Sequence, residues 1–364
     1  MVFSDLYKLS LREGFVIHFF QIAETDKQRI SLNDIDLRYH SYPYELMFRG
    51  AYDSIPKARL VLKLFISVWR SDADLVLLPG YHKLEFWIML MATILKGKKR
   101  AVFCDSTIFD QPQTFIKGLF KRLFFYSCHG FFAYGERAKS YLVAYGVQPQ
   151  KVYKRCQAAA LPFNYTPARA FQQRIQLGPA PSAPRFLYVG RLSPEKSLEL
   201  MLRAFWKVKE TLPCVILVLV GSGPQRQELE DLSRFLGLSE SVFFMGSMDS
   251  DALADEYSRA SCLVLPSYSE PWGLVVNEAL SYGCPVVVSS RCGCVPELVV
   301  NRSTGFVFES GNADELAKVL LAVPTAFADV ELTARYCIDL ISTFTPEAAA
   351  EEIFNGCKQI LATN

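Results

Sequence analysis

The chain has 364 residues, enough for two domains of ordinary size. Hydrophobic residues make up 51% of it and charged residues 21%, a composition that excludes an intrinsically disordered chain. The ten cysteines form no CxxC pair, and neither a signal peptide nor an apolar run long enough to span a membrane is recognisable. We therefore expect a cytoplasmic protein with reduced cysteines, no metal site and no nucleic-acid partner.

The chain opens with a helix-like stretch over residues 4–14, and a strand is expected within residues 11–23. Alternating strands and helices follow, which predicts an α/β fold with a doubly wound parallel sheet. The expected elements are a strand in Ser71–Gly80, a helix over 84–97, a strand in Arg100–Ser106, a strand in His129–Gly135 and a helix from Glu136.

The first half of the chain is basic and the second half acidic. Residues 1–167 contain 23 Lys and Arg against 14 Asp and Glu, whereas the remainder contains 16 against 23. Within the basic half, Phe115–Tyr126 mixes cations with Phe and Leu at helical spacing. Such a helix can lie on an anionic membrane surface, here at the inner face. The alternative is a core-facing apolar stripe with a solvated basic face.

A Pro- and Ala-rich segment, Leu177–Arg185, interrupts the periodicity and predicts an interdomain linker. The next segment, Phe186–Phe205, predicts a strand, a turn and a helix with Ser193 as N-cap and Lys196 in the first turn. Arg191 follows the strand directly. Two cations at a helix start favour a bound anion such as a diphosphate.

A long apolar strand in Val215–Pro224 ends in Gly221-Ser222-Gly223. A glycine-rich turn at the carboxyl end of a strand lets the backbone approach a ligand closely. This signal is weak alone, because many α/β folds contain such turns.

The segment Ser267–Ser289 places Glu270 and Glu278 around Pro271-Trp272-Gly273. A buried strand precedes Glu270, and a helix is expected to begin with Gly273 and Leu274. The backbone N–H groups of a helix start form an anion site. Two carboxylates beside an anion site suit a ligand that is both phosphorylated and rich in hydroxyls, as a nucleotide-sugar is.

The motifs GRLSPEK, VGSGP, FFMGSM and EPWGLVVNEALSYGCPVVVS, in this order, resemble the carboxyl-terminal domain of glycosyltransferase family 4, the retaining GT-B enzymes. The resemblance is strong over about 185–320 and looser over about 70–165. It implies a GT-B fold with two Rossmann-like domains, 1–176 and 185–345, facing across a cleft. A helix over 346–364 would cross back to the first domain. The opening helix stands where family members begin with a strand and a glycine-rich loop.

The resemblance also implies roles for individual residues. Arg191 and Lys196 would bind the diphosphate, Glu278 the ribose and Glu270 the sugar hydroxyls. For Glu278 a solvated helix carboxylate is the alternative, and for Trp272 core packing is as acceptable as ligand contact. The remaining donor-side residues would be Gly190, Gly221, Gly223, Pro271, Trp272 and the amides at Gly273 and Leu274.

Two residues at strand ends of the first domain are candidates for the acceptor side. Asp105 ends the strand AVFCD, and His82 lies just beyond DLVLLPG. The carboxyl ends of parallel strands border the ligand crevice in such sheets, so either residue could orient an acceptor hydroxyl. A helix-cap role is the alternative for Asp105.

The function that follows is transfer of a sugar, with retention, from a nucleoside-diphosphate-sugar to an acceptor hydroxyl. The resemblance implies a hexosyltransferase-like enzyme that needs neither metal nor cofactor. Its acceptor would be a sugar or a lipid-linked molecule in cell-surface polysaccharide or glycolipid synthesis. The alternatives are a nucleotide-sugar epimerase of similar fold and a catalytically silent nucleotide-sugar-binding partner protein.

Overall fold

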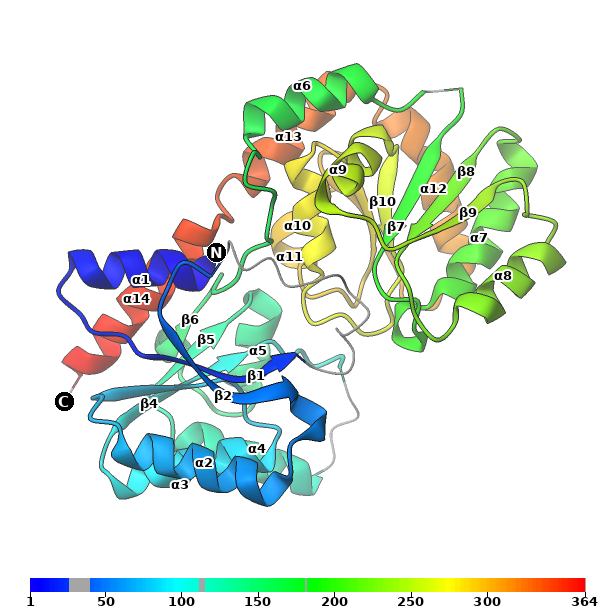
Figure 1. The fold of residues 1–364 in the computed structure, drawn as a ribbon. Helices are drawn as coiled ribbons and strands as arrows, with labels where there is room; N and C mark the ends of the chain where they lie inside the picture. The colour runs from blue at the N-terminus through cyan, green and yellow to red at the C-terminus, as the bar shows by residue number, and fades with distance from the viewer. Residues whose placement is uncertain (26–39, 111–114, 181, 364) are drawn as a thin grey trace. The chain divides into compact units, whose positions relative to one another are not determined.

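The structure, a computed structural model, describes residues 1–25, 40–110, 115–180 and 182–363. They form two compact units, Met1–Ala158 with Pro346–Asn364 and Ala159–Thr345. Each unit is a parallel sheet covered by helices (Figure 1). This is the α/β, two-domain GT-B fold expected from the sequence. Within the described ranges, no helix is both long and apolar enough to cross a membrane.

The sheet of the first unit has four parallel strands in chain order. The strands expected around residues 71–80, 100–106 and 129–135 are confirmed, as is the opening helix α1 (Val2–Arg12). Two further strands, β1 (Phe19–Thr25) and β2 (Tyr44–Ala51), form a separate parallel pair. The four strands are β3 (Leu75–Leu78), β4 (Lys99–Cys104), β5 (Gly130–Ala133) and β6 (Val152–Tyr153).

Different helices cover the two faces of this sheet. Side chains alternate along β4, so that Val102 packs in one apolar cluster and Ala101 in another. The Ala101 face is covered by α1 and α14 (Pro346–Ala362), and Gly356 lets α14 lie close to the sheet: a Cβ there would be 2.6 Å from Phe132. The Val102 face is covered by α2 (Lys57–Arg70), α3 (Leu84–Leu95), α4 (Phe115–Tyr126) and α5 (Glu136–Ala144).

The sheet of the second unit has six parallel strands in the order β12-β11-β10-β7-β8-β9. The chain runs outward from β7 to β9 and then returns to the other side of β7 with β10. The strand order therefore reverses between β7 and β10, where open α/β sheets bind their ligands. The strands are β7 (Arg185–Val189), β8 (Ile216–Val220), β9 (Val242–Gly246), β10 (Cys262–Leu265), β11 (Val286–Ser289) and β12 (Gly305–Phe308).

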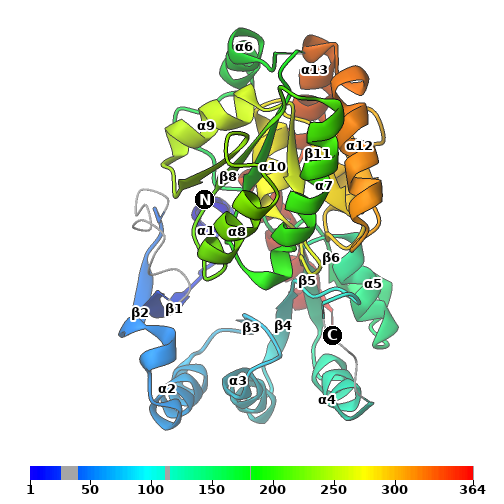
Figure 2. The same ribbon diagram turned by 90° about the vertical axis from the view of Figure 1, so that its right-hand side faces the viewer.

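Helices cover both faces of the second sheet (Figures 1 and 2). On one side lie α7 (Leu198–Thr211), α8 (Arg226–Phe235) and α12 (Ala313–Ala326). On the other side lie α6 (Pro167–Leu177), α9 (Ser250–Arg259), α10 (Leu274–Ser281) and α13 (Val330–Ile341).

The boundary between the units lies at Ala158–Ala159, earlier than the expected boundary at 176. The reason is α6, which precedes the expected linker but packs on α9 and α13 of the second unit. Its Arg174 is 1% exposed and donates hydrogen bonds to the carbonyls of Ser258 (2.9 Å) and Ala260 (2.6 Å) at the C-terminal end of α9. A cation is favourable at a helix C-terminus, so Arg174 fixes α6 to the second unit.

Replacing Arg174 by Leu should lower the free energy of unfolding of the second unit by about 3 kcal/mol, because buried carbonyls lose a charged donor. Urea-dependent hydrogen exchange of the α9 amides measures this. The control Arg169→Leu changes an exposed arginine of the same helix, whose hydrogen bond goes to Asn164, and should cost less than about 0.5 kcal/mol. Equal stability of the two variants would contradict the anchoring role.

Candidate functional site

The loop after β7 differs from the sequence prediction. Pro194–Lys196 forms a single 3₁₀ turn, and α7 begins only at Leu198. Between them Ser197 has a left-handed backbone with φ 54°, which separates the turn from the helix. Placing Ser193 as the N-cap and Lys196 in the first turn of α7 was therefore wrong. The Ser193 hydroxyl instead donates to Glu195 (2.7 Å).

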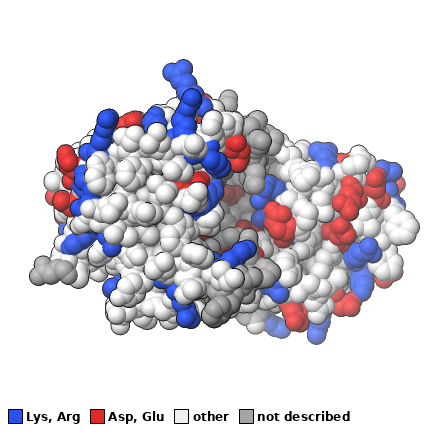
Figure 3. All heavy atoms as spheres, turned by 90° about the horizontal axis from the view of Figure 1, so that it is seen from below, with Lys and Arg blue, Asp and Glu red and all other residues white. Residues whose placement is uncertain are grey.

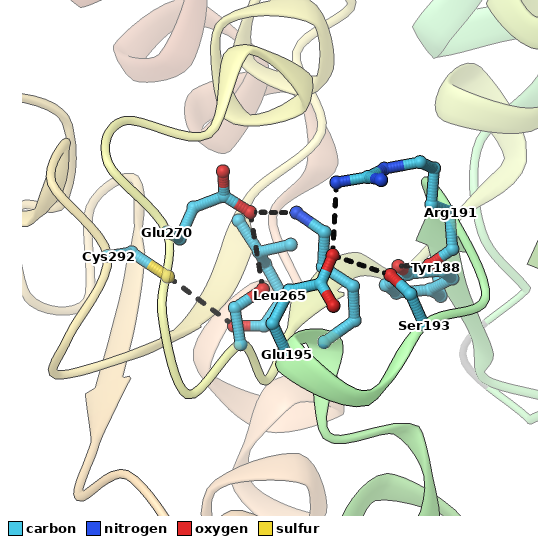
Figure 4. Close-up of polar contacts among 9 residues, drawn as sticks. Tyr188, Arg191, Ser193, Glu195, Leu265, Glu270 and Cys292 are labelled. Atoms are coloured by element: carbon cyan, nitrogen blue, oxygen red, sulfur yellow. Dashed lines mark hydrogen bonds and ion pairs between the residues drawn. The ribbon is translucent and has the colours of Figure 1, made fainter. Parts of the chain in front are cut away.

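Glu195 gathers the polar groups of this loop. Arg191 Nη2 lies 3.0 Å from a Glu195 oxygen, which also accepts the Ser193 hydrogen bond (Figure 4). Burial disfavours the charged carboxylate, but the hydrogen bond from Ser193 and the charges of Arg191 and Lys196 outweigh it and lower the pKa of Glu195. Glu195 is thus ionised at neutral pH and holds Arg191 in place.

An ion pair between Lys196 and Glu270 joins the loop after β7 to the loop after β10. Both side chains are mostly buried, with 15% and 13% exposure, and the Ser267 hydroxyl donates to the same Glu270 oxygen at 3.3 Å. The two loops flank the point where the strand order reverses. The structure therefore brings Arg191, Lys196 and Glu270 together, as the resemblance implies.

Backbone hydrogen bonds from the turn after β11 hold the Glu270 loop in place. Gly293 N–H donates to the Glu270 carbonyl (2.9 Å), and Cys294 N–H donates to the Trp272 carbonyl (3.1 Å). A Cβ at Gly293 would lie 1.7 Å from the Pro271 carbonyl oxygen, so only glycine permits this approach. The backbone of the loop is thus fixed before any ligand arrives.

Cys292 and Cys294 are fully buried within this turn. Their role is packing beneath the loop, and Cys292 Sγ lies 3.8 Å from the Leu265 carbonyl oxygen. In the part of the chain that the structure describes, no three His, Cys, Asp or Glu side chains are grouped as metal ligands would be.

Trp272 belongs to the core. Its side chain is 3% exposed and donates to Asn277 Oδ1 (2.8 Å), and its ring packs near Phe344. Of the two roles left open by the sequence, the burial and contacts of the indole support packing. The neighbouring Gly273 is the N-cap of α10 with φ 98°, and Leu274 is the first helical residue.

The glycines after β8 allow the loop after β8 to lie close to the loop after β7. A Cβ at Gly221 would lie 1.9 Å from the Gly190 carbonyl oxygen, and one at Gly223 would lie 2.3 Å from that of Leu192. Leu192 N–H also donates to the Ser222 carbonyl (2.9 Å). These glycines hold the Arg191 loop against the end of β8, a role the sequence did not reveal.

Glu278 lies in α10 and accepts a hydrogen bond from the Tyr257 hydroxyl of α9 at 2.7 Å. Burial raises the pKa of Glu278 to about 7, and the Tyr257 hydrogen bond opposes that rise. Tyr257 is buried and stacks on Tyr282 with ring centroids 5.9 Å apart. Glu278 is therefore a half-buried carboxylate that Tyr257 holds in position. No motif points to Tyr257, and only the packing of α9 on α10 reveals it.

The acceptor-side candidates lie at neighbouring strand ends of the first unit. Asp105 follows β4 and His82 follows β3, its paired strand. Burial and the charge of Lys83 lower the pKa of His82, whereas the charge of Asp105 raises it. The side chains of His82 and Asp105 therefore interact electrostatically. Residues 106–110, which follow Asp105, are not helical, so Asp105 does not cap a helix.

Sequence reasoning missed two further polar groups at the donor side. Tyr268 N–H donates to the Glu195 carbonyl (2.8 Å), and the Arg291 guanidinium lies 4.1 Å from the centre of the Tyr268 ring. Both belong to loops after strand ends, β10 and β11. A search for polar residues at every strand end would have found them.

The sequence of the second unit is similar to that of known proteins. Residues 170–324 match the family described as glycosyl transferases group 1. This part of the chain belongs to that family. The match runs from α6 into α12 and hence covers every donor-side residue named above.

Curated relatives share parts of the chain. An uncharacterized glycosyltransferase of Methanocaldococcus jannaschii is 38% identical over 144 residues, which is 40% of this chain and 36% of the relative. A D-inositol 3-phosphate glycosyltransferase of Kribbella flavida is 30% identical over 225 residues, 59% of this chain and 53% of the relative. The chain thus matches about half or less of the length of these relatives.

Solved structures share the whole fold. A sucrose-phosphate synthase of Thermosynechococcus elongatus superposes with a TM-score of 0.72 at 19% identity, covering 99% of this chain and 92% of the other. An Anabaena protein in complex with UDP-glucose gives a TM-score of 0.67 at 18% identity, with coverage of 100% and 95%. At these identities the likeness shows the fold alone.

The hydrogen bond from Tyr257 favours ionised Glu278, so Tyr257→Phe should raise the pKa of Glu278 by about one unit. The carboxyl stretching band in infrared titrations reports this pKa, and Glu278→Gln assigns the band. The control Tyr165→Phe removes a hydroxyl that donates to the Ser281 carbonyl and should leave the pKa unchanged. An unchanged titration in Tyr257→Phe would show that Tyr257 does not act on Glu278.

Proposed function

We propose that this protein is a retaining glycosyltransferase that moves a sugar from a nucleoside-diphosphate-sugar to an acceptor hydroxyl. The proposal rests on one observation above all: Arg191, Lys196 and Glu270 meet at the reversal point of the second sheet. Family membership over residues 170–324 supports transferase chemistry at that place.

In the proposed reaction, two cations face the diphosphate. Arg191 and Lys196 are each paired with a carboxylate in the free protein, Arg191 with Glu195 and Lys196 with Glu270. The diphosphate adds charge-assisted hydrogen bonds to both cations and stabilises the charge that develops on the leaving group. We assign this task to the two side chains and to the start of α10, with no metal and no cofactor.

Glu270 and Glu278 bind different hydroxyl groups of the donor substrate. Glu270 accepts hydrogen bonds from the sugar, because its oxygens lie beside the Lys196 ammonium that faces the diphosphate. Glu278 accepts from the ribose hydroxyls. Burial raises the pKa of Glu278 to about 7, and hydrogen bonds donated by the ribose hydroxyls favour its ionised form.

The donor sugar, the acceptor and the cellular site of action complete the proposed reaction. UDP-glucose is the first donor to test, because a protein of the same fold is known in complex with it. The acceptor is a sugar or a lipid-linked molecule, in cell-surface polysaccharide or glycolipid synthesis, and the protein acts in the cytoplasm at the inner face of a membrane. No observation favours an epimerase or a silent nucleotide-sugar-binding partner.

Replacing either cation by alanine should weaken binding of the nucleoside diphosphate by about 1.5–3 kcal/mol, because a charge-assisted hydrogen bond is lost. Calorimetry with UDP, after a screen of nucleotide-sugars by thermal shift, measures Arg191→Ala and Lys196→Ala. Arg234→Ala removes an exposed arginine of α8 and serves as the matched control with unchanged affinity. If both site variants bind as the unchanged protein does, the diphosphate site is misplaced.

Asp105→Asn should reduce turnover by about a hundredfold or more and leave donor affinity unchanged, because Asp105 is assigned to the acceptor hydroxyl. Turnover is measured as release of nucleoside diphosphate with a lipid extract as the acceptor source. Retention is read from the anomeric proton of the product. The control Asp72→Asn changes an exposed aspartate before β3. Full turnover of Asp105→Asn would refute the acceptor-side assignment, and a loss of donor binding would reassign Asp105.

A further inference from the structure

Three helices of the first unit lie side by side on one face of its sheet. α2 packs on α3, and Trp87 of α3 contacts Phe124 of α4 with ring centroids 5.0 Å apart. Figure 2 shows α2, α3 and α4 in a row along the lower side of this unit. We call their outward side the three-helix face.

The three-helix face carries large apolar side chains in helical stripes. On α4 the exposed residues recur at the spacing of a single stripe, whereas the buried Phe124 and Phe125 point into the core. The core-facing alternative for this helix therefore explains Phe124 and Phe125 but not the exposed stripe. The exposed apolar residues are Leu62, Ile66 and Trp69 of α2, Leu84, Met91, Ile94 and Leu95 of α3, and Ile116, Leu119, Phe120, Leu123 and Tyr126 of α4.

Several side chains of the three-helix face are exposed over more than half of their surface. Leu119 is 62% exposed, Leu95 66% and Tyr126 91%. Single exposed apolar residues need no explanation, but a contiguous set over three adjacent helices marks an interaction site.

The charges of the same helices have one sign. The three helices contain seven Lys and Arg and a single carboxylate, Glu85, which is 3% exposed. Arg59, Arg70, Lys117 and Arg122 are exposed. Figure 3 looks up at this side of the unit, where a broad uncharged area is bordered mainly by Lys and Arg.

We propose that the three-helix face docks on an anionic lipid bilayer, with its apolar side chains among the acyl chains and its cations at the headgroups. This specifies the membrane part of the proposed function and extends it from α4 to α2 and α3. Apolar residues within a cationic surround are the pattern of an interfacial membrane site. A second copy of the chain fits poorly, since a two-fold contact would bring the cations of both copies together.

The test is flotation with vesicles of phosphatidylcholine alone and of phosphatidylcholine with phosphatidylglycerol. The protein should bind the anionic vesicles, and binding should weaken as salt rises. Replacing Leu119 and Leu123 by Ser should weaken binding about tenfold for each residue. Replacing Lys117 or Arg122 by Gln should weaken it about fivefold each.

Matched controls come from the second unit. Phe235→Ser removes an apolar side chain that is 84% exposed, and Lys318→Gln removes an exposed cation of α12; neither should change flotation. Each variant is also tested for UDP binding and thermal stability, which should match the unchanged protein.

Several results would overturn the inference. Absence of flotation with anionic vesicles, while UDP binding persists, removes the membrane face and leaves the transferase proposal intact. Flotation that the α4 variants do not reduce places the contact elsewhere. A dimer that Leu119→Ser and Leu123→Ser dissociate, seen by analytical ultracentrifugation, shows that a second copy covers the face. If the unchanged protein floats with anionic vesicles but does not bind UDP, the result counts against the transferase proposal instead.

Discussion

The donor side depends on the ion pair between Lys196 and Glu270, because it joins the charged side chains of two loops that are far apart in sequence. The backbone hydrogen bond from Tyr268 N–H to the Glu195 carbonyl links the same two loops. The parallel order of the second sheet makes β7 and β10 neighbours, and the ion pair then fixes the distance between their loops. A partly buried pair costs desolvation, which the Ser267 hydrogen bond to Glu270 offsets in part. The pair therefore serves to position the two loops more than to stabilise the fold.

The charged groups of the site are held by contacts with other residues of the chain. Glu195 holds Arg191, Tyr257 holds Glu278, and the turn at Gly293 holds the backbone of the Glu270 loop. Side chains fixed in this way lose little conformational freedom when a ligand binds. Preorganised charges also need no reorientation while charge develops on a leaving group, which is the main source of electrostatic catalysis.

The sequence predicted what depends on local pattern. Strand and helix alternation predicted both sheets, and the helix expected to begin with Gly273 and Leu274 is α10, whose first residue is Leu274. It failed where tertiary contacts decide. A left-handed serine at 197 delays α7, although serine gives no sign of that conformation.

Burial was the other property that local pattern could not supply. Trp272 is buried, with its indole N–H bonded to Asn277 and its ring near Phe344, and neither contact can be read from spacing. Arg174 lies before the predicted linker, yet it binds carbonyls more than eighty positions away, at Ser258 and Ala260, and moves the boundary between the units. In α4 the periodicity showed an amphipathic helix, but only the structure shows that two sides of it are apolar, one buried against Val102 and one exposed.

The opposite charges of the two halves give the three-helix face its selectivity. Residues 1–167 carry a net charge of +9 and the remaining residues −7, so an anionic surface attracts one part of the chain and repels the other. The attraction decays over about 8 Å in physiological salt, so only cations close to the surface contribute. Arg59, Arg70, Lys117 and Arg122 lie on the same helices as the exposed apolar stripes and meet that condition whenever the stripes are inserted. Charge and apolar area therefore act at one place, and each strengthens the orientation that the other favours.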